Sequence, residues 1–189
     1  MANQTLDDAG YVDTDGDAVR EYSDGAPLHY RLMTGDDATA ARVAEVIQAG
    51  LQEAGISTEH QPVDFNTQMN KAFYEYDFDL NYWYWGMDPD PDFGGVIFQC
   101  DQLWWWNDSG YCDPEYDELY AASRAAIDHQ ERVEAVWAMQ EKIYNDRPWI
   151  VILYGTVIQA YRPSKFDGFN PASRYIVSGK WSLLQAAPQ

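Results

Sequence analysis

Hydrophobic positions recur along this chain with two periods, which separate the predicted strands from the predicted helices. A period of two, as in Leu28, Tyr30 and Leu32, is typical of a strand, whereas a spacing of three or four residues is typical of one helical face. In the first half, this pattern predicts a strand at 28–33, a helix at 37–54, a strand at 56–63, a short helix at 66–74 and a strand at 78–85.

In two of these elements, the sequence also predicts which residues share a face. The helix at 37–54 places its apolar residues on one face and has Gly55 positioned to end it; the face consists of Val43, Val46, Ile47 and Leu51. The strand at 78–85 is rich in aromatic residues, with Phe78, Leu80, Tyr82 and Tyr84 on one side and Trp83 and Trp85 on the other. Both sides of that strand must therefore be covered, or one must face a ligand.

The second half predicts two helices and a buried strand. Asp113, Pro114 and Glu115 form a strong helix start, and that helix extends to about residue 127. Asp128 begins the next helix, with Glu131 completing a capping box. Its predicted buried stripe is Val133, Val136, Trp137, Ile143 and Tyr144. The continuous apolar run at 149–154 is typical of a strand covered on both faces, so the order of elements favours an α/β layer fold.

Composition narrows the function classes. The chain has 189 residues and a formal net charge of -19, which repels nucleic acid and anionic lipid, so we expect no nucleic-acid partner. The acidic excess fits either hydration in salty surroundings or an ordinary acidic secreted surface. No apolar run approaches the roughly 18 to 20 residues that span a bilayer.

The chain opens on 2–10, which read as the end of a helix closed by Gly10. We therefore expect a preceding N-terminal part, the alternative being a short leading helix.

The only two cysteines, Cys100 and Cys112, flank a loop that contains three consecutive tryptophans. In an exported protein the pair would close this loop with a disulfide, worth about 3 kcal/mol by chain entropy. In a cytosolic protein they would be free thiols. Zinc is disfavoured, because the cysteines lack C-x-x-C spacing and the three histidines are scattered.

An acidic loop near the start offers oxygen atoms at alternating positions. Asp13, Asp15 and Asp17 are followed by Glu21 and Asp24 at the ninth and twelfth positions, a spacing that resembles a calcium loop. Ala18 occupies the sixth position, where an EF-hand has glycine. The alternative to a structural calcium site is a solvated turn.

Several motifs together resemble one protein family. Residues 9–21 read AGYVDTDGDAVRE, similar to the AGY-x-D-x-DGDG-x-RE signature of the family 5 extracellular solute-binding proteins, the dipeptide- and oligopeptide-binding group of ABC importers, although Ala18 replaces a glycine. Further matches follow in the family's order and cover nearly the whole chain: AEVIQAGLQEAGI at 44–56, FDL at 78–80, WGMDPDP at 85–91, GYCDPEYDEL at 110–119 and RPWI at 147–150.

The resemblance implies a fold, a location and partners. It implies most of the C-terminal lobe of a type II periplasmic-binding-protein fold at 1–148, with a mixed sheet flanked by helices, and a return segment at 149–189 that runs toward a first lobe absent from this chain. It further implies an extracellular, periplasmic or lipoprotein-anchored protein that captures a peptide or an oligosaccharide for ABC permease subunits. The exported character of the family favours the Cys100–Cys112 disulfide.

The resemblance also implies ligand-binding residues. Asp88 matches an aspartate that anchors a peptide's α-amino group, a charge-assisted contact; the alternative is an Asp-Pro-Asp-Pro turn with Asp90 and Asp92. The aromatic candidates are Trp83, Trp85, Trp104, Trp105 and Trp106. Trp83 fits a core position, whereas three consecutive tryptophans cannot all face one core, so at least one is expected on a surface or cleft wall.

Two other function classes remain open at this point. A secreted carbohydrate-active hydrolase could use some pair of the many carboxylates, but no spacing singles one out, and no G-x-S-x-G, H-E-x-x-H or phosphate-binding glycine loop is present. A structural surface domain is the third class. We therefore expect no enzyme activity and no cofactor beyond the calcium considered above.

Overall fold

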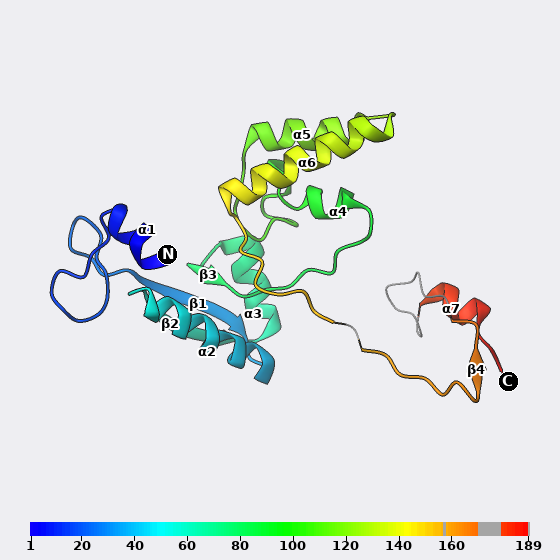
Figure 1. Ribbon diagram of the computed structural model, residues 1–189, viewed down its shortest axis with the longest axis horizontal. Helices are drawn as coiled ribbons and strands as arrows, with labels where there is room; N and C mark the ends of the chain where they lie inside the picture. Colours follow the sequence, from blue (N-terminus) through cyan, green and yellow to red (C-terminus); the bar gives the residue numbers. More distant parts are fainter. Residues whose placement is uncertain (157, 170–178, 189) are drawn as a thin grey trace. The chain divides into compact units, whose positions relative to one another are not determined.

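The computed structural model describes residues 1–156, 158–169 and 179–188, and the chain divides into two compact units, Met1–Trp149 and Ile150–Gln189 (Figure 1). The first unit contains a parallel sheet, the helices that pack on it and a helical hairpin. The described residues of the second form short elements only.

The sheet of the first unit has three strands in the order β2-β1-β3, all parallel. β1 (His29–Gly35) is central and pairs along its whole length with β2 (Ser57–Val63). These two strands confirm the predicted ones. β3 (Leu80–Asn81) has only two residues, so the predicted strand at 78–85 is wrong in length. Beyond the Tyr82 amide, which still donates to the Met33 carbonyl, the chain turns away because the next tryptophans pack on Phe73 instead of continuing the ladder.

α2 (Ala38–Glu53) connects β1 and β2 and confirms the predicted helix. The Asp37 side chain caps it by accepting from the Thr39 and Ala40 amides. The fully buried side chains are the small ones, Ala40 and Ala44, because they allow the helix to pack closely on the sheet. Val46, predicted on the buried face, is 73% exposed, so the buried stripe lies to one side of it.

The connection from β2 to β3 and the chain start are also helical. α3 (Phe65–Asn70) continues directly into one π-helical turn, η1 (Lys71–Glu75), in place of the single predicted helix. α1 (Ala2–Asp8) ends at Gly10, whose φ of 87° suits glycine, which confirms the helix end read from the sequence.

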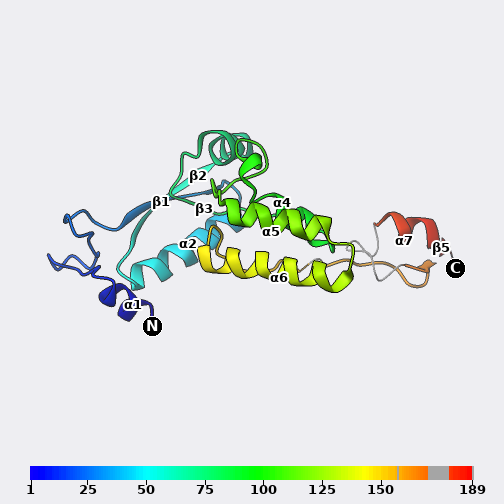
Figure 2. The same ribbon diagram turned by 90° about the horizontal axis from the view of Figure 1, so that it is seen from above.

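The helical hairpin consists of α5 (Pro114–Ala125) and α6 (His129–Asp146), which lie side by side (Figure 2). Asp113 and Asp128 cap them as predicted. Two short helices that the pattern missed, α4 (Pro91–Val96) and η2 (Cys100–Gln102), precede the hairpin. The hairpin core is formed by Ile97, Phe98, Tyr116, Tyr120 and Met139.

The predicted stripe of α6 is partly wrong. Trp137 is 63% exposed and Tyr144 is 74% exposed, whereas Met139, left out of the stripe, is buried against the hairpin core. The reason is that α6 packs mainly on α5, with Met139 reaching Gly95 of α4, so only part of its apolar surface is covered.

The second unit does not contain the predicted strand at 149–154. Residues 150–154 form no strand, and their side chains, including Ile150 at 78% and Tyr154 at 89%, are exposed. An apolar run becomes a buried strand only where a neighbouring strand pairs with it, and none of the described residues does so. Where the structure describes this unit, its regular elements are β4 (Phe166–Asp167), α7 (Lys180–Gln185) and β5 (Ala187–Pro188), with β4 and β5 antiparallel.

Candidate functional site

Trp83 and Trp85 lie on the segment that leaves β3, and both contact Phe73 on the π-helical turn. The Phe73 ring meets Trp83 at 6.0 Å and Trp85 at 5.9 Å between centroids, edge to face in each case. Tyr84, between them in sequence, is 80% exposed. Trp83 also stacks on Phe65, so it is a packing residue of the sheet's helical cover.

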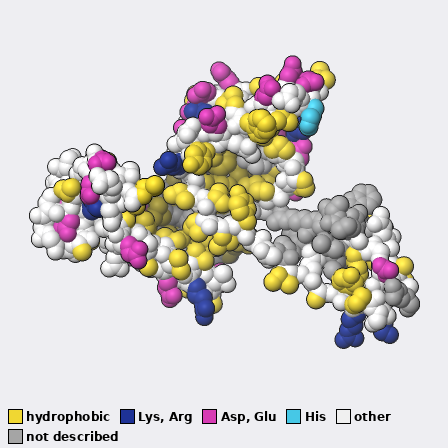
Figure 3. Space-filling view, viewed as in Figure 1, with side chains coloured by type: hydrophobic (Ala, Val, Ile, Leu, Met, Phe, Trp, Pro, Cys, Tyr) yellow, Lys and Arg dark blue, Asp and Glu magenta, His cyan; other side chains and the backbone are white. Residues whose placement is uncertain are grey.

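Trp85 is the centre of a larger group of rings. Its contacts are Phe93 of α4 at 5.6 Å, Trp106 at 6.0 Å and Trp149 at 6.5 Å, the last nearly parallel with an interplanar angle of 17°. Phe93 and Trp106 also meet each other at 6.0 Å. We call Trp85, Phe93 and Trp106 the aromatic wall. Figure 3 shows hydrophobic side chains gathered on the viewed face between the sheet and the helical hairpin.

Asp108 lies behind this wall, with only 5% of its surface exposed. Its Oδ2 accepts from the Trp85 indole Nε1 at 3.0 Å, and its Oδ1 accepts from the Trp149 indole Nε1 at 3.2 Å. Burial raises the pKa of Asp108 to about 6, because removing water disfavours the charged form more than the two indole bonds favour it.

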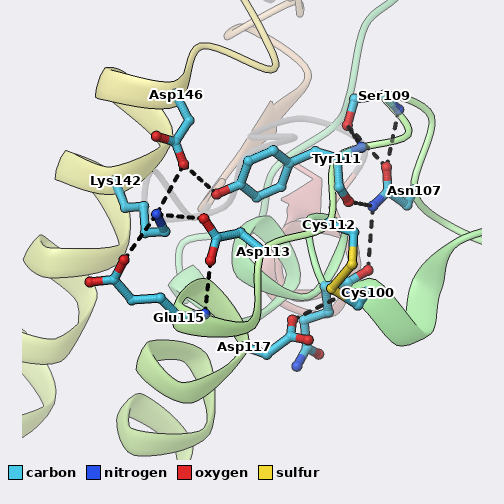
Figure 4. The surroundings of a disulfide bond; sticks show 11 residues. Cys100, Asn107, Ser109, Tyr111, Cys112, Asp113, Glu115, Asp117, Lys142 and Asp146 are labelled. Carbon is cyan, nitrogen blue, oxygen red and sulfur yellow. Dashed lines mark hydrogen bonds and ion pairs between the residues drawn. A yellow bond between two sulfur atoms is a disulfide. The ribbon is translucent and has the colours of Figure 1, made fainter.

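The loop that carries Trp106 and Asp108 is closed by a disulfide between Cys100 and Cys112, as the sequence leads us to expect (Figure 4). Asn107 organises the interior of the loop and is fully buried. Its Nδ2 donates to the Tyr111 carbonyl at 2.7 Å and to the Gln99 carbonyl at 3.3 Å, and its Oδ1 accepts from Ser109. The Asp108 side chain is thus held by a covalently closed and internally bonded loop.

The three consecutive tryptophans are divided between surface and wall. The Trp104 and Trp105 side chains are 57% and 63% exposed. Trp106 is 43% exposed and packs on Trp85 in the aromatic wall. Trp104 has a φ of 66° and packs against Tyr76, whose own φ is 51°, with ring centroids 4.8 Å apart. The prediction that they would not all face one core is confirmed.

An ionic group borders the same loop (Figure 4). Lys142 of α6 lies 2.7 Å from Asp113 and 3.2 Å from both Glu115 and Asp146, while the Tyr111 hydroxyl donates to Asp146 at 2.6 Å. The ammonium group lowers the pKa of Asp113, and the Tyr111 hydroxyl and Lys142 lower the pKa of Asp146. These contacts attach the disulfide loop and the start of α5 to α6.

Asp88 borders an open hollow of about 520 Å³ at the start of α4. The other charged lining residues are paired: Arg132 lies 2.8 Å from Asp90 and Arg124 lies 3.4 Å from Asp92. Arg132 lowers the pKa of Asp90. Asp88 is exposed and has no ion-pair partner among the described residues.

The hollow and the aromatic wall share one residue. Phe93 lines the hollow beside Asp88 and contacts both Trp85 and Trp106. The structure thus brings three of the predicted site residues, Asp88, Trp85 and Trp106, into one neighbourhood. Among the described residues, Trp83, Trp104 and Trp105 make no ring contact with Phe93, the aromatic residue of the hollow's lining.

The acidic loop brings Asp13, Asp15, Asp17 and Glu21 together, with one oxygen of each within 4.8 Å of the others. Asp24, at the twelfth position, is outside this group and accepts from the Ala26 amide. The oxygens also accept from the loop backbone, for example Asp13 Oδ2 from Ala18 N at 2.9 Å. Ala18 has a φ of 73°, the conformation that favours glycine. The calcium site stays a prediction.

Sequence reasoning missed Asp108, Phe93 and Trp149 as parts of one group. Asp108 follows Asn107 in a polar loop, and no periodicity marks it as buried. Its partners are 23 and 41 residues away in sequence. An acid inside a closed cysteine loop, between tryptophans and a GY motif, is the only local signal.

Comparison with known families places the chain. Residues 1–103 match the model of the bacterial extracellular solute-binding proteins, family 5 middle region, so the chain belongs to this family. A comparison with curated proteins found no match. No helix in the described part of the chain is long and apolar enough to cross a membrane.

Solved structures show the same fold. The oligopeptide-binding protein AppA of Bacillus subtilis, solved with a nonapeptide, is 25% identical with a TM-score of 0.68 over 77% of this chain and 29% of that one. A periplasmic oligopeptide-binding protein of Thermotoga maritima is 20% identical, with a TM-score of 0.82 over 99% of this chain and 38% of that one. NikZ of Campylobacter jejuni, solved with Ni(L-His), is 19% identical, with a TM-score of 0.66 over 77% of this chain and 30% of that one.

The fold is therefore that of type II periplasmic-binding proteins, an α/β architecture with a parallel sheet flanked by helices. This chain spans well under half the length of these three solved proteins.

Proposed function

We propose that this chain forms most of the solute-facing second lobe of an ABC-importer binding protein, and that the solute contacts the hollow beside Asp88. Family membership supports the class of function. The observation that carries the site is the position of Phe93, which joins the hollow to the aromatic wall.

Charge favours a peptide as the solute. Of the three aspartates that line the hollow, two are neutralised by arginines, which leaves Asp88 as the uncompensated carboxylate. A peptide's terminal ammonium group would complete the pairing, and its side chains would pack on Phe93 and Trp106. AppA was solved with a nonapeptide, which agrees with this class of solute. An oligosaccharide is the second candidate, because the same Thermotoga maritima protein was also solved with mannohexaose and exposed indole rings suit sugar rings.

The remaining parts of the proposal concern partners and location. Residues 149–189 serve as the return segment, and the exposed apolar run at 150–154 pairs with the other lobe of the two-lobed protein. The whole protein acts outside the cytoplasmic membrane, with a lipid anchor, and delivers solute to ABC permease subunits. It has no catalytic activity, since its relatives of known structure are binding proteins.

The test is a binding measurement on the two-lobed protein, made by isothermal titration calorimetry. The probes are an equimolar pool of random-sequence nonapeptides, the same pool N-acetylated, and mannohexaose. We expect binding of the free-amine pool, with weaker binding of the acetylated one. Cleavage of any probe during the titration would support the hydrolase class instead, and binding of mannohexaose alone would assign the oligosaccharide.

A further inference from the structure

Asp108 is the only described carboxylate that accepts hydrogen bonds from two tryptophan side chains. Its partners belong to different parts of the first unit: Trp85 follows β3 and belongs to the aromatic wall, whereas Trp149 is the last residue before the second unit. The two indole rings lie nearly parallel, 6.5 Å apart, with the carboxylate bridging their N–H groups.

We propose that Asp108 is a positioning residue for solute binding. Its two hydrogen bonds hold Trp85 of the aromatic wall and Trp149, the last residue of the first unit, in one fixed arrangement. This inference rests on the proposed function, in which the aromatic wall contacts the solute and the chain that follows Trp149 leads to the other lobe. A hinge transmits closure only if the segment that enters it is fixed to the lobe that moves.

Three observations favour a positioning role over ordinary packing. A buried carboxylate without a cation is costly, and hydrophobic residues of similar volume would fill the space at lower cost. Asp108 nevertheless makes no ion pair with any described residue. Its loop is closed by the disulfide and bonded through Asn107, which are the features needed to hold one carboxylate still.

Protonation provides a readout that simple packing lacks. The ionisable groups on the surrounding segments are Tyr76, whose hydroxyl donates to the Asn107 carbonyl, and Tyr111, whose hydroxyl donates to Asp146. Burial and the hydrogen bond to Asp146 raise the pKa of Tyr111 above its ordinary value. Asp108, with a pKa of about 6, is therefore the group that changes charge beside the indoles in mildly acidic solution.

The first experiment uses the 189-residue chain and follows the indole N–H resonances by NMR. We expect the Trp85 and Trp149 resonances to shift together with one midpoint near pH 6, and Asp108→Asn to abolish that shift. Asp117→Asn is the matched control, because Asp117 also accepts a bond in this loop, from the Cys100 amide, and touches no indole. Separate midpoints, or indole shifts unchanged in Asp108→Asn, would overturn the proposal.

The second experiment measures affinity for the nonapeptide pool in the two-lobed protein. Asp108→Asn should weaken binding about tenfold, the effect of losing one hydrogen bond to a charged group, while Asp117→Asn leaves it unchanged. In a Trp149→Phe background, which keeps an aromatic ring and removes the indole N–H, the additional loss should shrink to about threefold or less.

The outcomes separate the two proposals. If the wild type binds neither the peptide pool nor mannohexaose, the proposed function is wrong, and the indole titration still decides whether Asp108 bridges the two tryptophans. If the wild type binds and Asp108→Asn binds equally well, the positioning role is wrong. If Asp108→Asn does not fold, the wild-type titration and the Trp149→Phe affinity, expected to fall severalfold, decide in its place.

Discussion

The Tyr116 hydroxyl of α5 donates a hydrogen bond to the Gly95 carbonyl of α4 over 2.8 Å, inside the hairpin core. The contact is close because Gly95 has no side chain: a Cβ atom there would lie 2.6 Å from Met139 Cε and 2.9 Å from Tyr120 Cδ2. α4 thus packs against both hairpin helices at one glycine. Since α4 also carries Phe93, this contact fixes the position of Phe93 in the aromatic wall.

Gly95→Ala should therefore destabilise the chain by about 1 to 3 kcal/mol, the cost of overpacking a buried site. Gly94→Ala is the control, because its nearest neighbour, Met87 Sδ, would lie at an ordinary 3.5 Å. Urea denaturation followed by circular dichroism measures both. Equal stability of the two variants would contradict the packing argument.

Replacing Asp88 tests the amine anchor. In the two-lobed protein, Asp88→Asn should weaken binding of free-amine nonapeptides by about 2 to 5 kcal/mol, because closure buries the ammonium group without its partner. Binding of the N-acetylated pool should change little. Asp90→Asn is a useful comparison, since Asp90 is already paired with Arg132. Equal affinities for wild type and Asp88→Asn with both pools would reduce Asp88 to a turn residue.

The disulfide between Cys100 and Cys112 should be present in the exported protein and should stabilise it. Intact mass after alkylation, with and without reductant, distinguishes a disulfide from two free thiols. The double variant Cys100→Ser/Cys112→Ser should lose about 3 kcal/mol, the chain-entropy value for a loop of this length. It should also disturb the Trp106 position, seen as a change in tryptophan fluorescence. Free thiols in protein recovered from its natural location would refute the prediction.

The pH dependence of stability should carry the signature of Asp108. Its folded-state pKa of about 6 lies above the ordinary aspartate value of about 3.9, so the folded state holds the proton more tightly. The resulting stabilisation is complete below about pH 4 and is lost as the pH rises through 6. Relative to Asp108→Asn, the wild type should therefore lose about 2 to 3 kcal/mol between pH 4 and pH 7. Denaturation of both proteins at several pH values checks this; a constant difference would contradict it.

The acidic loop of Asp13, Asp15, Asp17 and Glu21 should bind calcium. Calorimetric titration should show binding at millimolar calcium, the affinity of extracellular modules. Asp15→Asn should remove it, whereas Asp24→Asn, outside the group, should not. No heat at millimolar calcium would leave the loop as a solvated turn.

Local features of the fold were readable from the sequence because their partners are close in the chain. Asp113 and Asp128 each cap a helix by accepting from amides two or three residues ahead, and Gly10 ends α1 at a left-handed position. Such bonds depend on few other residues, so residue type and spacing are sufficient to predict them. The family motifs added the fold class and Asp88.

Tertiary structure decided what depends on distant partners. The apolar run at 150–154 has strand composition, yet a strand requires a paired neighbour, and the described chain supplies none. The aromatic segment after β3 alternates like a strand, but β3 ends at Asn81, and Trp83 and Trp85 pack on Phe73. Asp108 became a buried bridge only because folding brings Trp85 and Trp149 together, 23 residues before it and 41 residues after it. No local sequence pattern predicts that Asp108 contacts both tryptophans, since this contact results from how the sheet, the loop and the hairpin pack.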